Sequence, residues 1–496
     1  MLLDRYHGDL VNALLSTQRV FITVIFLGLV GMAARNVVDP DAWWHLKTGE
    51  YIAAHRHVPH TDPFSYTRAG APWVAHEWLT DLILYGIYRV ASWSGLILVF
   101  AAILSAAFFL LFLRCAGSPY IAGILTLFGA CATAPIWGVR PQMLSLFLAS
   151  LWLWILERSE RNHNLLWWTP LVMLLWVNLH AGFALGIALL LLFLAGEILE
   201  RALGQHAVEP SHLRIGTLAA AFVLNLLVVP LNPYGARMYT YPLETLRSQA
   251  MQNYIVEWAS PNFHRIEYLP LLILLLVTVG LLAWSNAGLR AREMLLLLVG
   301  AFAALSAIRM IPLLVMIAVP IISKSLQPNS ASPLRVQRIQ RTRRFSISFL
   351  NAGILLFMAA FVAIHLTHVI RHQHQSEAEP FPAAPIVLLE TQPASGPIFN
   401  QYDWGGYLIW RLYPQTKVFI DGRADLYGEP LLQQFAETYQ LKRNWKGVLA
   451  EWRIATIIVP PDSALATGLR TSPDWTVSYE DSRAVVFSKL RPWTLR

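Results

Sequence analysis

The chain has 496 residues, of which 56% are apolar and only 14% are charged, and it contains 19 tryptophans. A water-soluble fold of this composition could not cover its surface with polar groups, so the bilayer is the expected solvent. The formal net charge of +8 does not indicate nucleic acid as a partner, because many basic residues stand in short loops beside apolar runs, where they set membrane topology. With only Cys115 and Cys131 present, a disulfide framework and a thiolate metal site are both excluded.

Apolar runs fill most of residues 1–370 and predict a polytopic, all-α membrane domain. The first run, 20–34, follows Arg5 and Arg19 and ends at Arg35 without a small-residue cleavage site, which predicts a retained anchor with its N-terminus in the cytoplasm. A crossing must span a hydrocarbon core of ~30 Å. The eleven expected crossings are 20–35, 95–113, 119–137, 141–157, 165–179, 182–200, 214–230, 268–285, 293–307, 309–326 and 347–369.

The charges fix an expected orientation. Five arginines between 335 and 344 form the strongest basic cluster and are expected in the cytoplasm. The segment 76–90 is apolar on one face and charged on the other, so we interpret it as an interfacial helix. Crossings can be counted back from this cluster or forward from the N-terminus. The two counts place the loops on the same sides of the membrane only if 76–90 does not cross it. The loop 36–94 and everything after 371 are then outside.

The character of the chain changes at 371, where charges appear and the apolar runs shorten. Pro380, Pro382 and Pro385 mark a linker. Strands are expected at 417–421, 456–460, 475–480 and 484–488, and helical periodicity at 430–452. Residues 371–496 therefore predict a small α/β domain outside the membrane.

Under this topology, the polar residues that are unusual in a membrane protein all fall on the outer face. They are Asp39, Asp41, His76, Glu77, Arg140, Asn178, His180, Asn232, Tyr234, Glu257, Trp258 and Arg309. Each has an ordinary structural explanation: Asn178 and His180 could bond between helices, and Arg309 could reach the interface. A one-sided set nevertheless indicates an outward-facing site, because ionisable residues at membrane depth are costly.

Two carboxylates, Asp39 and Asp41, come directly after the first apolar run. Such a pair can act as a general base with a tuning partner, or both can bind a divalent cation such as Mg²⁺ or Mn²⁺. Alternatively, one of them caps the helix expected to begin near Ala42, and position favours Asp41 for this role.

The acidic pair after the first apolar run, the long outer loop and the outward C-terminal domain together resemble the GT-C superfamily of membrane glycosyltransferases. The run from Asp39 to His45 is similar to the DPxxNYR run of oligosaccharyltransferases, whose acidic residue is catalytic or metal-associated and matches Asp39. The run YDWGGY at 402–407 is similar in place to their acceptor-reading WWDYGY motif, but it lacks the paired tryptophans, so a peptide acceptor does not follow. The run FIDGRAD at 419–425 resembles bacterial membrane proteins described as GT-C-like.

This resemblance implies a glycosyltransferase of the bacterial cytoplasmic membrane that moves a hexosyl or pentosyl group from a polyprenyl-phosphate donor to an acceptor on the outer face. Asp39 or Asp41 would be the base, and Arg140 and Arg309 would bind the donor phosphate. The residues expected to contact or orient the acceptor are His45, His76, Glu77, His180, Asn232, Tyr234, Glu257, Asp403, Asp421 and Arg423. For Asp421 and Arg423, a turn and a salt bridge are an equally good explanation.

Two other classes of function fit the same residues. A transporter or flippase of a lipid-linked substrate would use the outward polar groups to bind head groups and would need no base. A catalytically silent assembly protein on a GT-C body would tolerate replacement of both aspartates.

Overall fold

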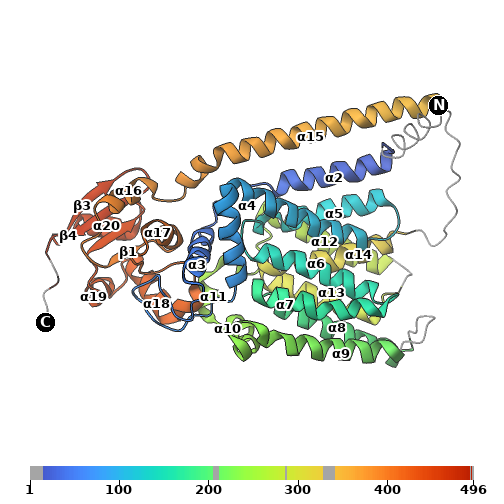
Figure 1. The fold of residues 1–496 in the computed structure, drawn as a ribbon, viewed down its shortest axis with the longest axis horizontal. Helices are drawn as coiled ribbons and strands as arrows, with labels where there is room; N and C mark the ends of the chain where they lie inside the picture. Colours follow the sequence, from blue (N-terminus) through green and yellow to red (C-terminus); the bar gives the residue numbers. More distant parts are fainter. Residues whose placement is uncertain (1–14, 205–211, 285–287, 328–340, 492, 494–496) are drawn as a thin grey trace.

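The computed structural model describes residues 15–204, 212–284, 288–327, 341–491 and 493. Figure 1 shows a bundle of roughly parallel helices with a mixed α/β part beyond one end of it. The bundle helices are α2 (Thr17–Ala33), α5 (Pro119–Thr133), α6 (Gln142–Arg158), α7 (Thr169–Leu179), α8 (Phe183–Ala202), α9 (His212–Val228), α12 (Leu269–Trp284), α13 (Ala291–Ser306), α14 (Ile311–Ser325) and α15 (Arg341–Ala378).

Each of the eleven predicted apolar segments coincides with a helix. In the described residues, seven helical stretches are long and apolar enough to cross a membrane: Trp78–Arg114, Pro119–Ile136, Phe183–Ala202, Arg214–Leu231, Ile266–Trp284, Ile308–Ser325 and Ser348–Glu377. Their length and composition indicate an integral membrane protein. The crossings at 20–35, 141–157, 165–179 and 293–307 stay predictions, and the arginine cluster at 335–344 lies outside the residues and side chains that the structure describes.

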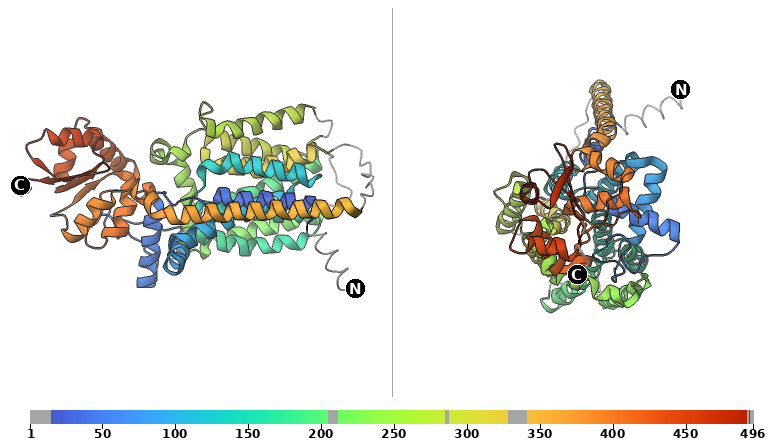
Figure 2. Two further views of the ribbon diagram at one scale, coloured as in Figure 1. Left: turned by 90° about the horizontal axis from the view of Figure 1, so that it is seen from above. Right: turned by 90° about the vertical axis from the view of Figure 1, so that its left-hand side faces the viewer.

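Two helices run transverse to the bundle at the end that faces the α/β part (Figure 2). They are α3 (Asp41–His55) and the first arm of α4 (Trp78–Arg114), which breaks at Ser92 with φ 52° and ψ −153°. A left-handed φ is unfavourable for serine. The break is held by the next residue, Trp93, which is buried between Trp43 and Tyr88 with ring centroids 4.8 and 5.0 Å away. This geometry favours the interfacial interpretation of 76–90.

The C-terminal part contains a four-stranded sheet in the order β1-β2-β4-β3. The strands are β1 (Ile398–Asn400), β2 (Thr456–Val459), β3 (Trp475–Glu480) and β4 (Val485–Lys489), and the helices are α16 (Ala383–Thr391), α17 (Gly405–Leu412), α18 (Ala424–Tyr439), α19 (Trp445–Glu451) and α20 (Ala464–Arg470). β1 pairs with β2 in parallel, and the other pairs are antiparallel. The last three strands therefore lie where the sequence predicts them.

The predicted strand at 417–421 is wrong. Only Val418 pairs there, through a single bridge to Ser65, and the sheet position goes to β1 instead. The backbone of this segment is satisfied elsewhere, because the Val418 N–H donates to the Phe64 carbonyl and the Phe419 N–H donates to the Asn400 side chain. The predicted helix at 430–452 is two helices, α18 and α19, separated near Leu441, which has φ 55°.

The loop 36–94 joins the bundle to the C-terminal part. The Tyr66 hydroxyl donates to the Ile398 carbonyl at 2.8 Å, and the Thr67 hydroxyl donates to the Phe419 carbonyl at 2.6 Å. On α3, Trp43 packs edge-on against Tyr407 of α17, with ring centroids 4.9 Å apart. Helix α3 is thus enclosed between the bundle and the α/β part, and this placement positions the residues described next.

Candidate functional site

Asp39 organises the beginning of α3. Its Oδ1 accepts the backbone N–H of Asp41, the first residue of α3, at 2.9 Å. Asp41, which the sequence favoured as the cap, is not one: the N-cap position is Pro40, and α3 has no side-chain cap hydrogen bond. Oδ2 of Asp39 lies 2.5 Å from Nε of Arg140, which stands between the short helix η1 (Ala134–Ile136) and α6. Both oxygens of Asp39 are therefore engaged.

Arg140 bridges two carboxylates. Besides Asp39, its Nη1 contacts Oε1 of Glu257 on the short helix η5 (Val256–Trp258). Burial lowers the pKa of Arg140, but the negative charges of Asp39 and Glu257 more than offset this and hold its pKa above the ordinary value. The guanidinium is thus a permanent cation that fixes both acids in place.

Asp41 is the first residue of α3 and lies against the C-terminal part. Its Oδ1 accepts the indole N–H of Trp44 at 2.9 Å. A Cβ at Gly422 would lie only 1.8 Å from this same oxygen, so the carboxyl packs directly on the Gly422 backbone. Burial and the neighbouring charge of Asp39 raise the pKa of Asp41 to about 7. A carboxyl with a pKa near the working pH is suited to act as a general base.

Arg309 is a cation without a carboxylate partner. It lies on the short helix η7 (Ile308–Met310), and its guanidinium stacks over the ring of Trp258 at 4.5 Å. Within the described part of the chain, its guanidinium makes no hydrogen bond or ion pair. Because Trp258 adjoins Glu257, Arg309 lies beside the Asp39–Arg140–Glu257 cluster with its charge available to an anion.

A second cluster surrounds the buried Glu77. Nitrogens of three histidines approach its carboxylate: His45 at 3.6 Å, His76 at 3.3 Å and His180 at 3.3 Å. Burial alone would raise the pKa of Glu77, but these histidines, His76 foremost, hold it well below its usual range. Glu77 is therefore an anion at neutral pH.

His45 and His180 differ in charge although both face Glu77. Burial lowers the pKa of His45, but Asp81, 2.6 Å from its Nδ1, outweighs this and its pKa rises to about 9. Burial lowers the pKa of His180 to about 3. Because its Nδ1 accepts the Gly182 N–H at 2.9 Å, the proton of neutral His180 is assigned to Nε2, which faces Glu77.

Asn232 and Tyr234 connect loops. The Asn232 amide donates to the Val177 carbonyl at 2.9 Å. The Tyr234 hydroxyl donates to the Pro59 carbonyl at 2.7 Å and accepts the Ala75 N–H at 2.9 Å. Of these two predicted acceptor residues, Asn232 is thus bonded to α7 and Tyr234 to the outer loop.

The YDWGGY segment docks on the beginning of α3. A Cβ at Gly406 would lie 2.5 Å from the Pro40 carbonyl, so only glycine allows this approach. Asp403 is exposed to solvent. The hydroxyl of Tyr402 is buried and has no hydrogen-bond partner in the described residues. This segment closes the site from the side opposite the bundle.

Asp421 and Arg423 lie in a buried ion network. The Arg423 guanidinium contacts both oxygens of Asp421 at 2.8 and 2.6 Å and reaches Asp62 of the outer loop at 2.8 Å. Asp421 also accepts the Tyr427 hydroxyl at 2.5 Å. All of these groups are engaged with one another, which favours the salt-bridge explanation of this pair over a role in contacting the acceptor.

No family model matches the chain, and no curated protein matches it in sequence. Solved structures do resemble it. ArnT from Cupriavidus metallidurans, bound to undecaprenyl phosphate, matches with a TM-score of 0.51 at 13% identity over 94% of this chain and 96% of that one. The archaeal oligosaccharyltransferase AglB from Archaeoglobus fulgidus, in complex with an inhibitory peptide and a dolichol-phosphate, matches with a TM-score of 0.57 at 9% identity over 88% of this chain and 68% of that one.

The chain has the GT-C superfamily fold. In this GT-C fold the acidic pair follows the first bundle helix, as the resemblance implied. A divalent cation does not fit the pair as it stands: both oxygens of Asp39 and Oδ1 of Asp41 already have partners. Among the described residues, no group of three or more His, Cys, Asp or Glu side chains is arranged to hold a metal.

Sequence reasoning missed several residues of the candidate site. Asp81 stands one helical turn after Glu77, a spacing that could have paired the two with His45. Ser145, whose hydroxyl lies 2.7 Å from Nδ1 of His180, and Asp62 gave no signal, because their partners lie 35 and 361 residues away in the chain.

Proposed function

We propose that this protein is an integral membrane glycosyltransferase that moves a sugar from a polyprenyl-phosphate donor to an acceptor on the outer face of the membrane. The observation that carries the proposal is that two groups lie beside the Asp39–Arg140–Glu257 cluster: Asp41, a carboxyl with a pKa of about 7, and Arg309, a cation with no carboxylate partner among the described residues. One group can take a proton and the other can neutralise a leaving phosphate.

In this mechanism, Asp41 accepts the proton of the acceptor hydroxyl. The hydroxyl oxygen bonds to C1 of the sugar, and the bond from C1 to the donor phosphate breaks, with its electron pair leaving on the phosphate oxygen. Arg309 stabilises the anion that is released. Arg140 is already held by two carboxylates, so its role is to position Asp39 and Glu257.

An apolar groove near the second cluster supports a lipid-linked donor. It has a volume of about 580 Å³ and lies between Trp78 of α4, the α7 leucines 171, 174 and 175, and the loop from Pro230 to Pro233. Trp78 directly follows Glu77, so the groove adjoins the polar site. A groove walled by leucine and proline is suited to an isoprenoid chain.

Separate substitutions of the two aspartates distinguish the role of the proposed base, Asp41, from that of Asp39, which holds Arg140. Asp41→Asn should lower turnover by roughly 100-fold or more, the scale of general-base loss, while donor binding is retained because the base contacts the acceptor. The readout is the glycolipid and glycan profile of a deletion strain complemented with each variant, with native mass spectrometry of the bound lipid phosphate. Asp39→Asn should also reduce turnover, because it releases Arg140.

The matched control is Asp474→Asn, an exposed carboxylate of the C-terminal part, which should restore the profile fully. Arg309→Gln should show the converse of Asp41→Asn, with donor binding weakened by about 1.5 to 3 kcal/mol for a lost charged hydrogen bond. If Asp41→Asn and Asp39→Asn both restore the wild-type profile, the transferase proposal fails and a binding or flipping function takes its place.

A further inference from the structure

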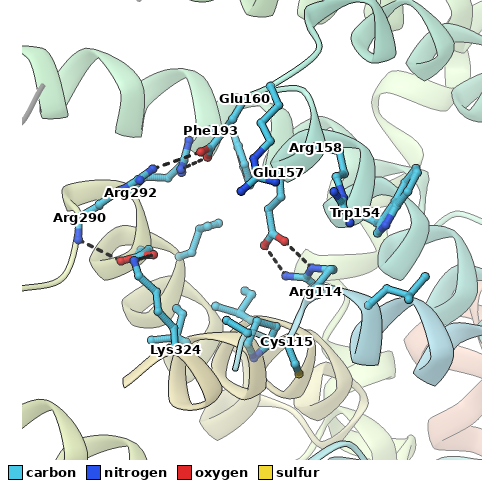
Figure 3. Close-up of a pocket in the computed structure, with 18 residues that line it drawn as sticks. Arg114, Cys115, Trp154, Glu157, Arg158, Glu160, Phe193, Arg290, Arg292 and Lys324 are labelled. Carbon is cyan, nitrogen blue, oxygen red and sulfur yellow. Dashed lines mark hydrogen bonds and ion pairs between the residues drawn. The ribbon is translucent and has the colours of Figure 1, made fainter. Parts of the chain in front are cut away.

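A charged cavity lies at the end of the bundle remote from the candidate site. It has a volume of about 380 Å³ and opens among the last residues of α4, α6 and α14 and the first residues of α13 (Figure 3). Helices α6 and α14 begin two residues after Arg140 and Arg309 and run for 17 and 15 residues. At 1.5 Å per residue, the cavity is roughly 22 to 25 Å from the candidate site. It is a separate feature of the fold.

Cations outnumber anions in the lining. The basic side chains are Arg114, Arg158, Arg161, Arg290, Arg292 and Lys324, and the acidic ones are Glu157, Glu160 and Glu293. The difference between six cations and three anions leaves a formal charge of +3. A volume of this size lies within the range of roughly 300 to 1,000 Å³ that small-molecule sites occupy.

Each acidic side chain of the lining already forms an ion pair with one or more of the basic side chains. Glu157 is held by Arg114 through two bonds of 2.8 and 2.7 Å. Glu293 lies 2.7 Å from Nζ of Lys324, and Glu160 is shared by several arginines, Arg292 among them. Arg158 and Arg161 are exposed, and their guanidinium groups make no hydrogen bond or ion pair among the described residues. The surplus charge therefore rests chiefly on these two side chains.

Two buried guanidiniums have donors left over. The side chains of Arg114 and Arg292 are only 3% and 5% exposed, and Nη1 of each has no hydrogen-bond partner in the described residues. Nη1 of Arg292 still has a carboxylate nearby, Oε2 of Glu197 at 3.9 Å, whereas no ion pair reaches Nη1 of Arg114 among these residues. A buried donor without an acceptor costs free energy. Arginines that merely mark one side of a membrane protein can reach water or lipid head groups. The buried Nη1 of Arg114 cannot, and an anion in the cavity would supply its missing acceptor.

From this combination, we propose that the cavity binds a phosphate group. Guanidiniums present paired donors that match phosphate oxygens. Arg158 and Arg161 would supply the charge at the mouth, and Arg114 would donate from the buried wall. Apolar neighbours such as Phe193 and Ile317 allow the phosphate to be the head group of a lipid, but the same donors would bind a free phosphate compound. This proposal does not depend on the proposed transferase activity.

The test uses the full-length protein, delipidated in detergent. Inorganic pyrophosphate is added at constant ionic strength and thermal unfolding is followed. In parallel, native mass spectrometry compares retention of phosphatidylglycerol with that of phosphatidylethanolamine. A shift with pyrophosphate identifies a soluble phosphate ligand, and selective retention of phosphatidylglycerol without such a shift identifies a lipid head group. Either result supports the site.

Variants decide whether the cavity is responsible. The double variant Arg158→Gln and Arg161→Gln alters exposed, unpaired side chains and should weaken binding by ~10-fold or more, the scale of lost charged contacts. The double variant Arg114→Gln and Glu157→Gln removes the buried pair without leaving a lone charge and should weaken binding likewise. Arg247→Gln, an exposed arginine on α10 (Tyr241–Arg247), is the control. The proposal is overturned if neither probe binds the wild type or if both double variants bind like the control.

Discussion

Asp39 and Asp41 stand two residues apart, yet their surroundings give them different roles. Asp39 is bound by the Arg140 guanidinium and by the backbone of α3. Asp41 has one indole N–H and the Gly422 backbone beside it, and its pKa is about 7. A buried carboxyl whose pKa lies near the working pH is a usual candidate for the base of an active site. This difference makes Asp41 the stronger candidate for the base.

The raised pKa of Asp41 predicts the pH dependence of transfer. A general base works only when ionised, so activity should rise with pH through about 7 and then level off. Asp39→Asn removes the charge that raises the pKa of Asp41, so the midpoint of the residual activity should move to lower pH. The measurement is the initial rate of sugar transfer in membranes from the complemented strain, taken across the pH range. A rate that falls as pH rises through 7 would contradict a basic role for Asp41.

The sequence indicated which residues are unusual but not what they contact. Asp39, Arg140 and Glu257 could be selected because polar side chains follow apolar runs, whereas their joining through one guanidinium depends on partners 101 and 117 residues apart. Arg423 shows the same limit, since its network requires Asp62 from the outer loop. Long-range pairing of this kind is set by tertiary structure and leaves no local pattern.

At the scale of elements, α3 is held by glycines that let backbones touch. Gly406 approaches the Pro40 carbonyl, Gly422 approaches Asp41, and Gly49 on α3 approaches the Asp81 carbonyl, where an added Cβ would lie 2.1 Å away. Backbone cannot yield as a flexible side chain does, so the contacts of Gly406 and Gly49 fix α3 between the bundle and the α/β part, while Gly422 leaves room for the Asp41 carboxylate. The position of Asp41 depends on them.

Adding a methyl group at one of these glycines should therefore push α3 away from the structure that it packs against. Gly406→Ala should destabilise the protein by about 1 to 3 kcal/mol, the cost of overpacking, and should lower transfer by displacing α3. Gly353→Ala is the matched control, because its Cβ would meet nothing within 4 Å and alanine favours a helix. Thermal unfolding with activity in the same preparation is the measurement. Equal melting temperatures for the two variants would show that the contact is not tight.

Elements were predictable where periodicity or length was distinctive. The last three strands and all eleven apolar helices lie where the sequence placed them. The strand at 417–421 failed because its β-branched and aromatic residues are buried by the outer loop without joining the sheet. The break at Ser92 has no proline to announce it. Gly95 is the local signal, because a Cβ there would lie 2.6 Å from Ala91 on the first arm, and Trp93 packs on the distant Trp43, which no local pattern reveals.

At the scale of the molecule, the order of segments was enough to indicate the GT-C fold, although identity to the solved structures is only 13% and 9%. A bundle, an outer loop carrying an acidic pair and a terminal α/β part are arrangements that hydropathy and spacing reveal. What hydropathy does not reveal is the lateral order of the helices, because each apolar helix is compatible with many neighbours. The charged cavity at the far end, which is lined by residues of five helices, was for that reason not foreseen.

The orientation of the protein in the membrane can be tested at the two ends of α6. This helix begins at Gln142, beside the candidate site, and ends at Arg158, beside the charged cavity. If it crosses the membrane, residues near its two ends must label from opposite sides. In a variant carrying Cys115→Ala and Cys131→Ala, we expect Asp474→Cys and Ser92→Cys, both exposed positions, to react with a membrane-impermeant maleimide in spheroplasts. Asn164→Cys, exposed just beyond the far end of α6, should react only after permeabilisation. The reverse pattern would place the candidate site in the cytoplasm. If Asp474→Cys were labelled and Ser92→Cys were not, the first arm of α4 would cross the membrane, and the expected number of eleven crossings would be wrong.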